Sequence, residues 1–285
     1  MKKVRMNRGV IFGWLMLAAP ATAQPVSDQA IKDFVDSHAA VTHQGKIARW
    51  EDPVCPQVNG LPANFTKFIT KRVREVAAQV GAPVDPDETG CKSNIEIVFT
   101  ASPQDLLDSI RKKQPLYLGY YASPAQADEM AKIKRVIQAW HATQQVDLRG
   151  NKMIDSYEHI RPSGHDLNIA ASAGLRIGDG MRSTYYRGLI VADPGKLVDF
   201  EMGALADHIA MLALAQPENL DACAELPSIL DMTHPTCRKD KPVKALTKAD
   251  TGYLQGLYKA LQSGASLGFQ KDSIAYQIKQ VTEKP

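Results

Sequence analysis

Hydrophobic residues recur at intervals of three and four along several stretches of the chain, and this spacing predicts helices with one buried face. The clearest stretch is 65–80, which Gly81 follows at the position that helix C-termini favour. A second stretch covers 198–215, where a row of small residues runs beside the larger ones. Further helices are expected in 24–41, 103–110 and 247–264.

Alternation of apolar and polar residues predicts strands in 94–100 and 183–191, and a short strand in 47–50. Residues 133–143 fit a helix or a strand equally well. Strands and helices that alternate in this way indicate the α+β or α/β classes, and we expect an α+β fold.

The first 23 residues have the layout of a secretory signal peptide, with a basic start, an apolar run over 10–19 and a small-x-small site ending at Ala23. The apolar run is about half of the roughly 20 residues that a membrane-spanning helix needs. Gln24 rather than a cysteine follows the site, which argues against a lipid anchor. We therefore expect a periplasmic or secreted protein with no integral membrane segment after cleavage.

The chain of 285 residues has 34 Lys and Arg against 31 Asp and Glu. Four of the basic residues belong to the predicted signal peptide, so the remainder is nearly neutral. A neutral chain gives no electrostatic support for nucleic acid as a partner. The expected organisation is a signal peptide (1–23), a lead-in (24–45) and a single domain (46–285), with a sheet-rich half (46–182) and a second half (183–285).

All four cysteines follow the predicted cleavage site, and an even count in an exported chain indicates disulfides. We expect the pairs nearest in sequence, Cys55–Cys91 and Cys223–Cys237. A zinc site is the alternative, but no pair has C-x-x-C spacing.

The last third of the chain combines a strand with three recognisable segments. These are Leu-Ala-Leu at 212–214, Pro-Ser-Ile-Leu-Asp-Met at 227–232, and a helix with Leu-Thr-Lys-Ala-Asp at 246–250 and Leu-Tyr at 257–258. Their order resembles the catalytic region of zincin metalloproteases of the metzincin type, which carry H-E-x-x-H-x-x-G-x-x-H on the active helix and a methionine turn beneath the metal.

Two earlier segments extend this resemblance over most of the chain. Arg-Trp-Glu-Asp-Pro-Val at 49–54 and the strand at 94–100 are similar to a group of uncharacterised, secreted, zincin-like proteobacterial proteins. The resemblance implies a mixed sheet, a helix of the active-site type and a helical C-terminal part.

Aligned on 212–214, the resemblance places Ala206 and Ala210 where the two zinc-binding histidines belong. Asp207 falls at the general-base glutamate, Gln216 at the third ligand and Met232 in the methionine turn. Two imidazoles at i and i+4 share a helix face and reach one metal, whereas alanine has no lone pair to offer. The resemblance therefore implies a scaffold that has lost its zinc site and needs no cofactor.

His208 lies about 200° around the helix from Ala206, so it cannot replace a missing ligand. His208 is expected to be exposed or to cap the helix, and Asp207 to be a solvated helix residue. Both remain weak catalytic candidates. The alternative to a degenerate zincin is an unrelated α+β fold in which the alanines only pack against a neighbouring helix.

Other catalytic patterns are weaker still. His159, His165, Asp155 and Asp166 include metal-binding and acid–base side chains, but their irregular spacing defines no geometry. The chain has no G-x-S-x-G elbow, no P-loop and no dinucleotide fingerprint.

Three functions follow from these observations. The first is a non-catalytic protein that binds an extended peptide or an envelope partner, with 183–191 as the strand that receives the peptide. The second is a secreted hydrolase or peptidase with an atypical site. The third is a structural envelope protein, which a filled space beside Ala206 and Ala210 would favour over a binding module.

Overall fold

The computed structural model describes residues 26–87, 90–156, 180–221, 223–234, 236–237, 241–260 and 264–284. The predicted signal peptide and the weak candidates His159, His165 and Asp166 lie outside the described residues.

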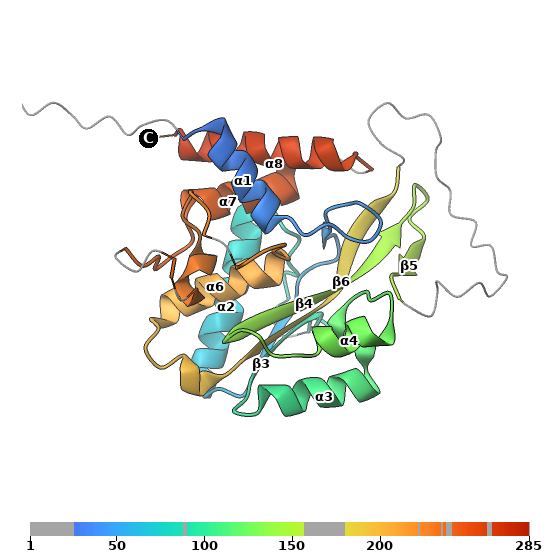
Figure 1. Ribbon diagram of the computed structural model, residues 1–285, viewed down its shortest axis with the longest axis vertical. Helices are drawn as coiled ribbons and strands as arrows, with labels where there is room; N and C mark the ends of the chain where they lie inside the picture. The colour runs from blue at the N-terminus through green and yellow to red at the C-terminus, as the bar shows by residue number, and fades with distance from the viewer. Residues whose placement is uncertain are drawn as a thin grey trace, which may run out of the picture.

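The protein has an α+β fold in which helices cover both faces of one sheet (Figure 1). The helices are α1 (Asp28–His38), α2 (Ala63–Val80), α3 (Pro103–Lys113), α4 (Pro124–Met130), α6 (Met202–Leu214), α7 (Lys248–Gln255) and α8 (Leu267–Thr282). Short helical turns are η1 (Pro115–Leu118), η2 (Pro194–Lys196), η3 (Ile229–Thr233) and η4 (Gly256–Ala260).

Six strands form one mixed sheet in the order β2-β3-β6-β4-β5, and β1 also pairs with β6. The strands are β1 (Arg49–Trp50), β2 (Pro56–Asn59), β3 (Ile95–Phe99), β4 (Ile137–Val146), β5 (Lys152–Ile154) and β6 (Arg182–Ala192). The predicted strands are confirmed, and the ambiguous segment 133–143 contributes to β4. The pairs of β1 and β3 with β6 are parallel, whereas β4 runs antiparallel to β6.

Strand β6 is central in the sheet, so the prediction that 183–191 receives a peptide at its edge is wrong. On one side β6 pairs with β4 along its whole length, from Arg182 to Ala192. On the other side β1 pairs with Thr184 and Tyr185, and β3 pairs with the end of the strand. Both edges of β6 are therefore occupied.

Two hydrophobic clusters hold the sheet between its helices. The larger cluster joins one face of the sheet to α1, α2, α6, α7 and α8, and includes Trp50, Ile209 and Tyr253. The smaller cluster packs α3 and η1 against the other face, around Leu107 and Trp140. Helix α6 is buried on all sides from Ala204 to Leu214, as expected of a helix that is apolar all round.

The ends of the predicted helices show which local signals are reliable. Gly81 has φ of 89° and ends α2 as predicted, because glycine adopts this left-handed conformation without strain. Thr247 and Asp250 form a capping box at the start of α7. Helix α6, in contrast, begins at Met202 rather than at 198, and Val198 is 78% exposed.

The lead-in is part of the main core. Helix α1 packs on α8 near the C-terminus, and Ile31, Phe34 and Val35 are buried in the larger cluster (Figure 1). The ring of Phe34 stacks on that of His38, with centroids 3.8 Å apart.

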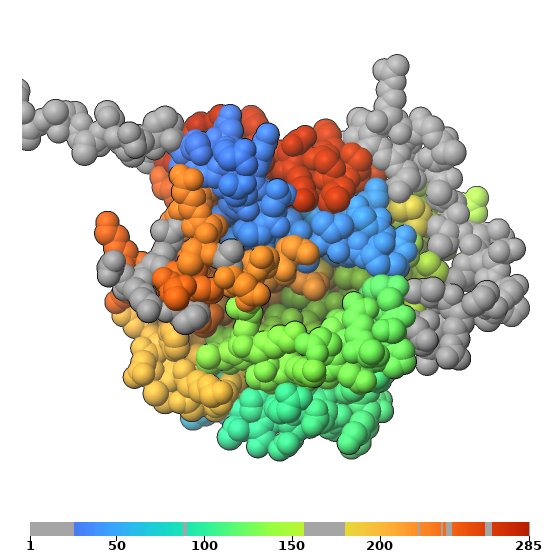
Figure 2. Space-filling view, viewed as in Figure 1, coloured from blue at the N-terminus to red at the C-terminus, as the bar shows by residue number. Residues whose placement is uncertain are grey.

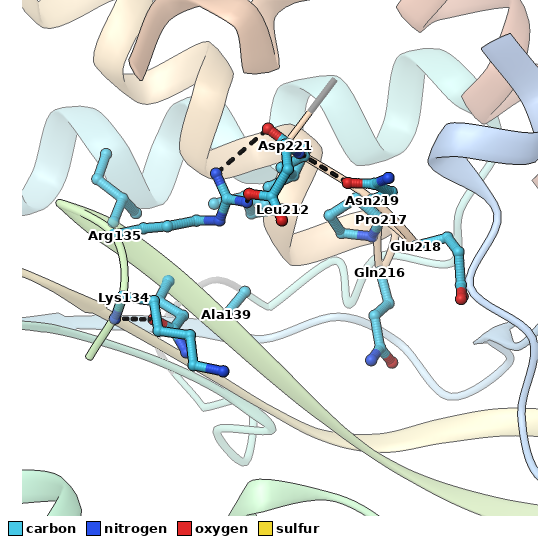
Figure 3. A pocket seen from close by; sticks show the side chains of 12 residues that line it. Lys134, Arg135, Ala139, Leu212, Gln216, Pro217, Glu218, Asn219 and Asp221 are labelled. Carbon is cyan, nitrogen blue, oxygen red and sulfur yellow. Dashed lines mark hydrogen bonds and ion pairs between the residues drawn. The ribbon is translucent and has the colours of Figure 1, made fainter. Parts of the chain in front are cut away.

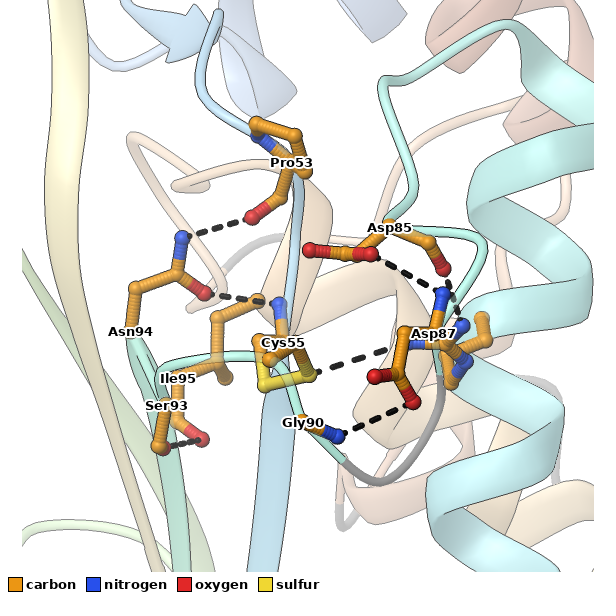
Figure 4. Close-up of a disulfide and its surroundings, with 10 residues drawn as sticks. Pro53, Cys55, Asp85, Asp87, Gly90, Ser93, Asn94 and Ile95 are labelled. Carbon is orange, nitrogen blue, oxygen red and sulfur yellow. Dashed lines mark hydrogen bonds between the residues drawn. A yellow bond between two sulfur atoms is a disulfide. The ribbon is translucent and has the colours of Figure 1, made fainter.

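Both predicted disulfides are present. Cys55–Cys91 ties the segment before β2 to the segment before β3, and the Asn94 side chain accepts a hydrogen bond from the Cys55 amide at 2.8 Å (Figure 4). Cys223–Cys237 closes a loop between α6 and α7. Such pairs are typical of proteins that fold in an oxidising compartment.

Candidate functional site

The helix that the resemblance singled out has no open surface at its degenerate positions. Ala206 and Ala210 are both 0% exposed and belong to the larger hydrophobic cluster. A cavity or groove that reached them would leave their side chains accessible. The space beside the two alanines is therefore filled.

Asp207 is a buried ion-pair residue, so the expectation of a solvated position is wrong. Its Oδ1 accepts a hydrogen bond from Nε of Arg72 on α2 at 2.5 Å. Its Oδ2 accepts one from the backbone amide of Leu246 at 2.9 Å. Both carboxylate oxygens thus connect α6 to neighbouring segments. Asp207 therefore has a structural role and is not placed as a general base that faces a substrate.

His208 is also buried, at 1% exposure, which corrects the expectation of an exposed or capping residue. Its Nδ1 lies 3.1 Å from the carbonyl oxygen of Ile229 in η3. Burial lowers the pKa of His208 to about 4. The imidazole is uncharged at neutral pH and fixes η3 against α6.

The methionine-containing segment folds as η3 and packs on α6. Ser228 begins η3 in a capping box with Asp231, and Met232 lies partly buried against the main cluster. Cys223, His234 and Cys237 lie close together nearby, but the two sulfurs are bonded to each other. A disulfide provides no thiolate, so this group does not fit a zinc site.

Gln216, at the position that the resemblance gives to the third ligand, is partly exposed and lines two hollows. It follows the end of α6, where its backbone amide donates to the Tyr185 hydroxyl at 3.1 Å. Its carbonyl oxygen accepts from the Ala40 amide at 3.1 Å, and the Glu218 amide donates to Ser37 O at 3.1 Å. These bonds hold 216–218 beside the segment that follows α1.

Two adjoining hollows lie between this segment and β4, and both are lined by Gln216 and Glu218. The Arg135 hollow has a volume of about 180 Å³, and its lining side chains include Arg135 and Ala139, with Gln216 pointing toward β4 (Figure 3). The His141 hollow has a volume of about 360 Å³. Figure 2 shows this face recessed between the blue and orange segments and the green segment below. We call the two hollows together the β4 cleft.

Strand β4 turns an edge toward this cleft that no described strand pairs with at residues 137–139, whereas the backbone of Gly119 lies against the carbonyl oxygen of His141. The carbonyl of Val136 accepts from the Asp193 amide, so alternate residues along β4 bond to β6. Ile137, Ala139 and His141 therefore direct their N–H and C=O groups to the other side. On that side β5 pairs only with β4 residues 144–146, and no other described strand pairs with 137–141.

The His141 hollow is built from four segments that are far apart in sequence. They are 40–43, 118–120, 141–143 and 216–218, with Gln126 and Met130 of α4 at the rim. His43 stacks on Tyr120 at a centroid distance of 3.9 Å and forms one wall. His141 is 4% exposed, and neither of its ring nitrogens has a hydrogen-bond partner.

Comparison with protein-family models, with curated proteins and with solved structures finds no match for this chain. None of the helices in the described part of the chain has the length and apolar character needed to cross a membrane. Among the described residues that line the β4 cleft there is no serine or cysteine, so these residues supply neither of the commonest side-chain nucleophiles. The arrangement suits binding through backbone groups and side-chain pockets.

Proposed function

We propose that this protein is an exported, non-catalytic binding protein that holds an extended peptide along the edge of β4 at residues 137–139. The observation that carries the proposal is the outward direction of the N–H and C=O groups on Ile137 and Ala139, beside two hollows. An added strand satisfies such groups and places alternate side chains into neighbouring pockets.

The absence of catalysis is supported by the environment of α6. Ala206 and Ala210 offer no metal ligand, and Asp207 is already held by Arg72 and the Leu246 amide. The order β6, α6, η3, α7 is the order expected of a degenerate zincin scaffold. The peptide-receiving edge in this proposal is β4, whereas the sequence pointed to β6.

Export to the periplasm or the medium is supported by the predicted signal peptide and by the two disulfides. The filled space beside Ala206 and Ala210 by itself favours a purely structural envelope protein over a binding module. The β4 cleft is what favours a binding role over that alternative.

The proposal is tested with residues 24–285 and a panel of fluorescein-labelled nonapeptides of Ser, Thr and Val with one variable position. Fluorescence anisotropy should detect binding, and N-methylation at alternate peptide residues should abolish it. The variant Ala139→Pro removes an outward donor that β6 does not use and should weaken binding at least about tenfold. Ala139→Ser keeps that donor and is the matched control.

Thermal unfolding of both variants shows whether the sheet is intact. Equal binding by the intact Pro and Ser variants would exclude the edge of β4. Failure of the whole panel to bind would favour the structural alternative. Chelator-sensitive cleavage of any peptide would contradict a non-catalytic protein.

A further inference from the structure

The described lining of the His141 hollow carries a negative charge and no lysine or arginine. Among the described residues that line it, Glu218 carries the only carboxylate. Glu218 is exposed, and its Oε2 lies 3.4 Å from the Val41 amide, so it keeps acceptor capacity toward the hollow. The hollow is therefore complementary to a positive charge.

His141 lines this hollow from β4, and both of its ring nitrogens are buried. Its ring lies against that of Tyr185, with centroids 4.6 Å apart, and near the backbone of Leu212 and Ala213 at the end of α6. Burial lowers the pKa of His141 to about 4, so the neutral ring has one nitrogen lone pair and one N–H at neutral pH. The C-terminal end of a helix carries partial negative charge, which also favours a cation there.

The remaining walls suit the hydrocarbon part of a long side chain. Leu118 and Met130 are apolar, and the stacked rings of His43 and Tyr120 present an amphipathic surface. Lysine and arginine side chains combine an apolar stem with a charged head, and such side chains bury the stem while the head reaches acceptors.

We propose that the His141 hollow receives a basic side chain of the peptide bound along β4. This inference rests on the proposed function, because it needs a strand paired with the edge of β4. The peptide residue opposite Ala139 projects its side chain to the face of the sheet on which Ala139 and His141 lie, and a long side chain there reaches the diagonal neighbour. The basic residue is therefore the one opposite Ala139, because the backbone of Gly119 lies against the carbonyl oxygen of His141.

The experiment uses nonapeptides of Ser, Thr and Val that differ only at the centre, which holds arginine, its neutral isostere citrulline, or glutamate. Anisotropy titrations should show arginine bound about tenfold more tightly than citrulline, and glutamate bound most weakly. The variant Glu218→Gln should reduce the preference for arginine over citrulline about fivefold. Glu75→Gln removes an exposed carboxylate on α2, outside the hollow, and should leave the preference unchanged.

His141→Phe keeps the volume of the ring and removes both nitrogens, so it should also reduce the preference for arginine while the citrulline peptide still binds. Binding of all three peptides with equal affinity would overturn the basic pocket and leave the peptide-binding function in place. Failure of all three to bind would overturn both. A preference that survives Glu218→Gln and His141→Phe would assign the basic residue to another position and overturn the inference.

Discussion

Three buried histidines link the stability of this protein to pH at the scale of single residues. Burial lowers the pKa of His38, His141 and His208 to about 4 each. An unfolded chain takes up these protons near its ordinary pKa of about 6.5, whereas the folded protein does not. Stability that is present at neutral pH is therefore lost as the pH falls from about 6.5 toward 4.

One buried carboxyl group works in the opposite direction. Burial raises the pKa of Asp250 to about 6, although its carboxylate accepts hydrogen bonds from Ser228, Ile229 and Thr247. The folded protein binds this proton before the unfolded chain does, so the protonation of Asp250 stabilises the fold between about pH 6 and 4. This offsets part of the effect of the three histidines.

We expect His141→Phe to flatten the loss of stability in acid. Neither ring nitrogen of His141 lies within geometric hydrogen-bond distance and angle of a described partner, so Phe in its place removes the pH-linked free energy at little cost in hydrogen bonding. Between pH 7.5 and pH 5.0 the variant should lose about 2 kcal/mol less of its free energy of unfolding than the unmodified protein. Urea unfolding at the two pH values measures this difference. An identical loss in both proteins would show that His141 is accessible to protons in the folded state.

At the scale of elements, one ion pair joins two helices that face each other in the core. Arg72 of α2 holds Asp207 of α6, whose side chain is 4% exposed, while that of Arg72 is 34% exposed. The aspartate already has one hydrogen bond from Leu246, so the pair mainly serves to neutralise a buried charge.

Arg72→Met should therefore lower the free energy of unfolding by about 2 to 3 kcal/mol, near the low end for buried pairs, since Arg72 is partly exposed. Lys71→Met is the matched control, because Lys71 is 73% exposed and pairs with Glu75, which is itself exposed. That control should change stability by less than about 0.5 kcal/mol. Urea unfolding at pH 7.5 compares the two variants. A cost for Arg72→Met no larger than the control would mean that Asp207 is neutral or solvated.

Local signals in the sequence predicted several elements, because those elements are decided locally. The stripe before Gly81 predicted α2, the alternation in 94–100 predicted β3, and the motif around Thr247 predicted the start of α7. Strand β4 was ambiguous, since it is buried on both faces from Trp140 onward and shows no alternation there. The central place of β6 was missed because strand order depends on pairing between distant segments.

The site was harder to predict than the fold. Gln216 was identified through a motif, and it does line the β4 cleft. His43, Tyr120 and His141 were not identified as a group, because 40–43, 118–120 and 141–143 meet only after the sheet has formed. A histidine inside an apolar segment, as at Trp140-His141, was the one signal that pointed toward this hollow.

At the scale of the whole molecule, contacts between the two ends of the chain contribute to the stability of the fold. Helices α1 and α8 pack together in the part of the molecule away from α3 (Figure 1). The Lys46 side chain reaches the carbonyl of Ala265 at 3.0 Å, and the Ile47 amide donates to the side chain of Gln270 at 2.9 Å. The lead-in and the C-terminal helix therefore stabilise the same core.

The last expectation concerns metal content. Contacts within the protein hold helix α6 to the segments around it. Arg72 neutralises Asp207, His208 bonds to Ile229, and Cys223–Cys237 closes the loop that follows α6. We expect a core that is held in this way to be stable without a metal.

We therefore expect residues 24–285, exported and purified without a metal-affinity tag, to contain no stoichiometric metal by elemental mass spectrometry. Treatment with EDTA should leave the midpoint of thermal unfolding unchanged, because an ion pair, hydrogen bonds and apolar packing hold α6 to its described neighbours. About one zinc per chain would mean that histidines outside the degenerate motif bind it, and His159, His165 and His234 would then be replaced one at a time. A midpoint that falls after chelation, together with restored stability on adding zinc alone, would place a structural metal in this fold and remove the main reason for calling its scaffold degenerate.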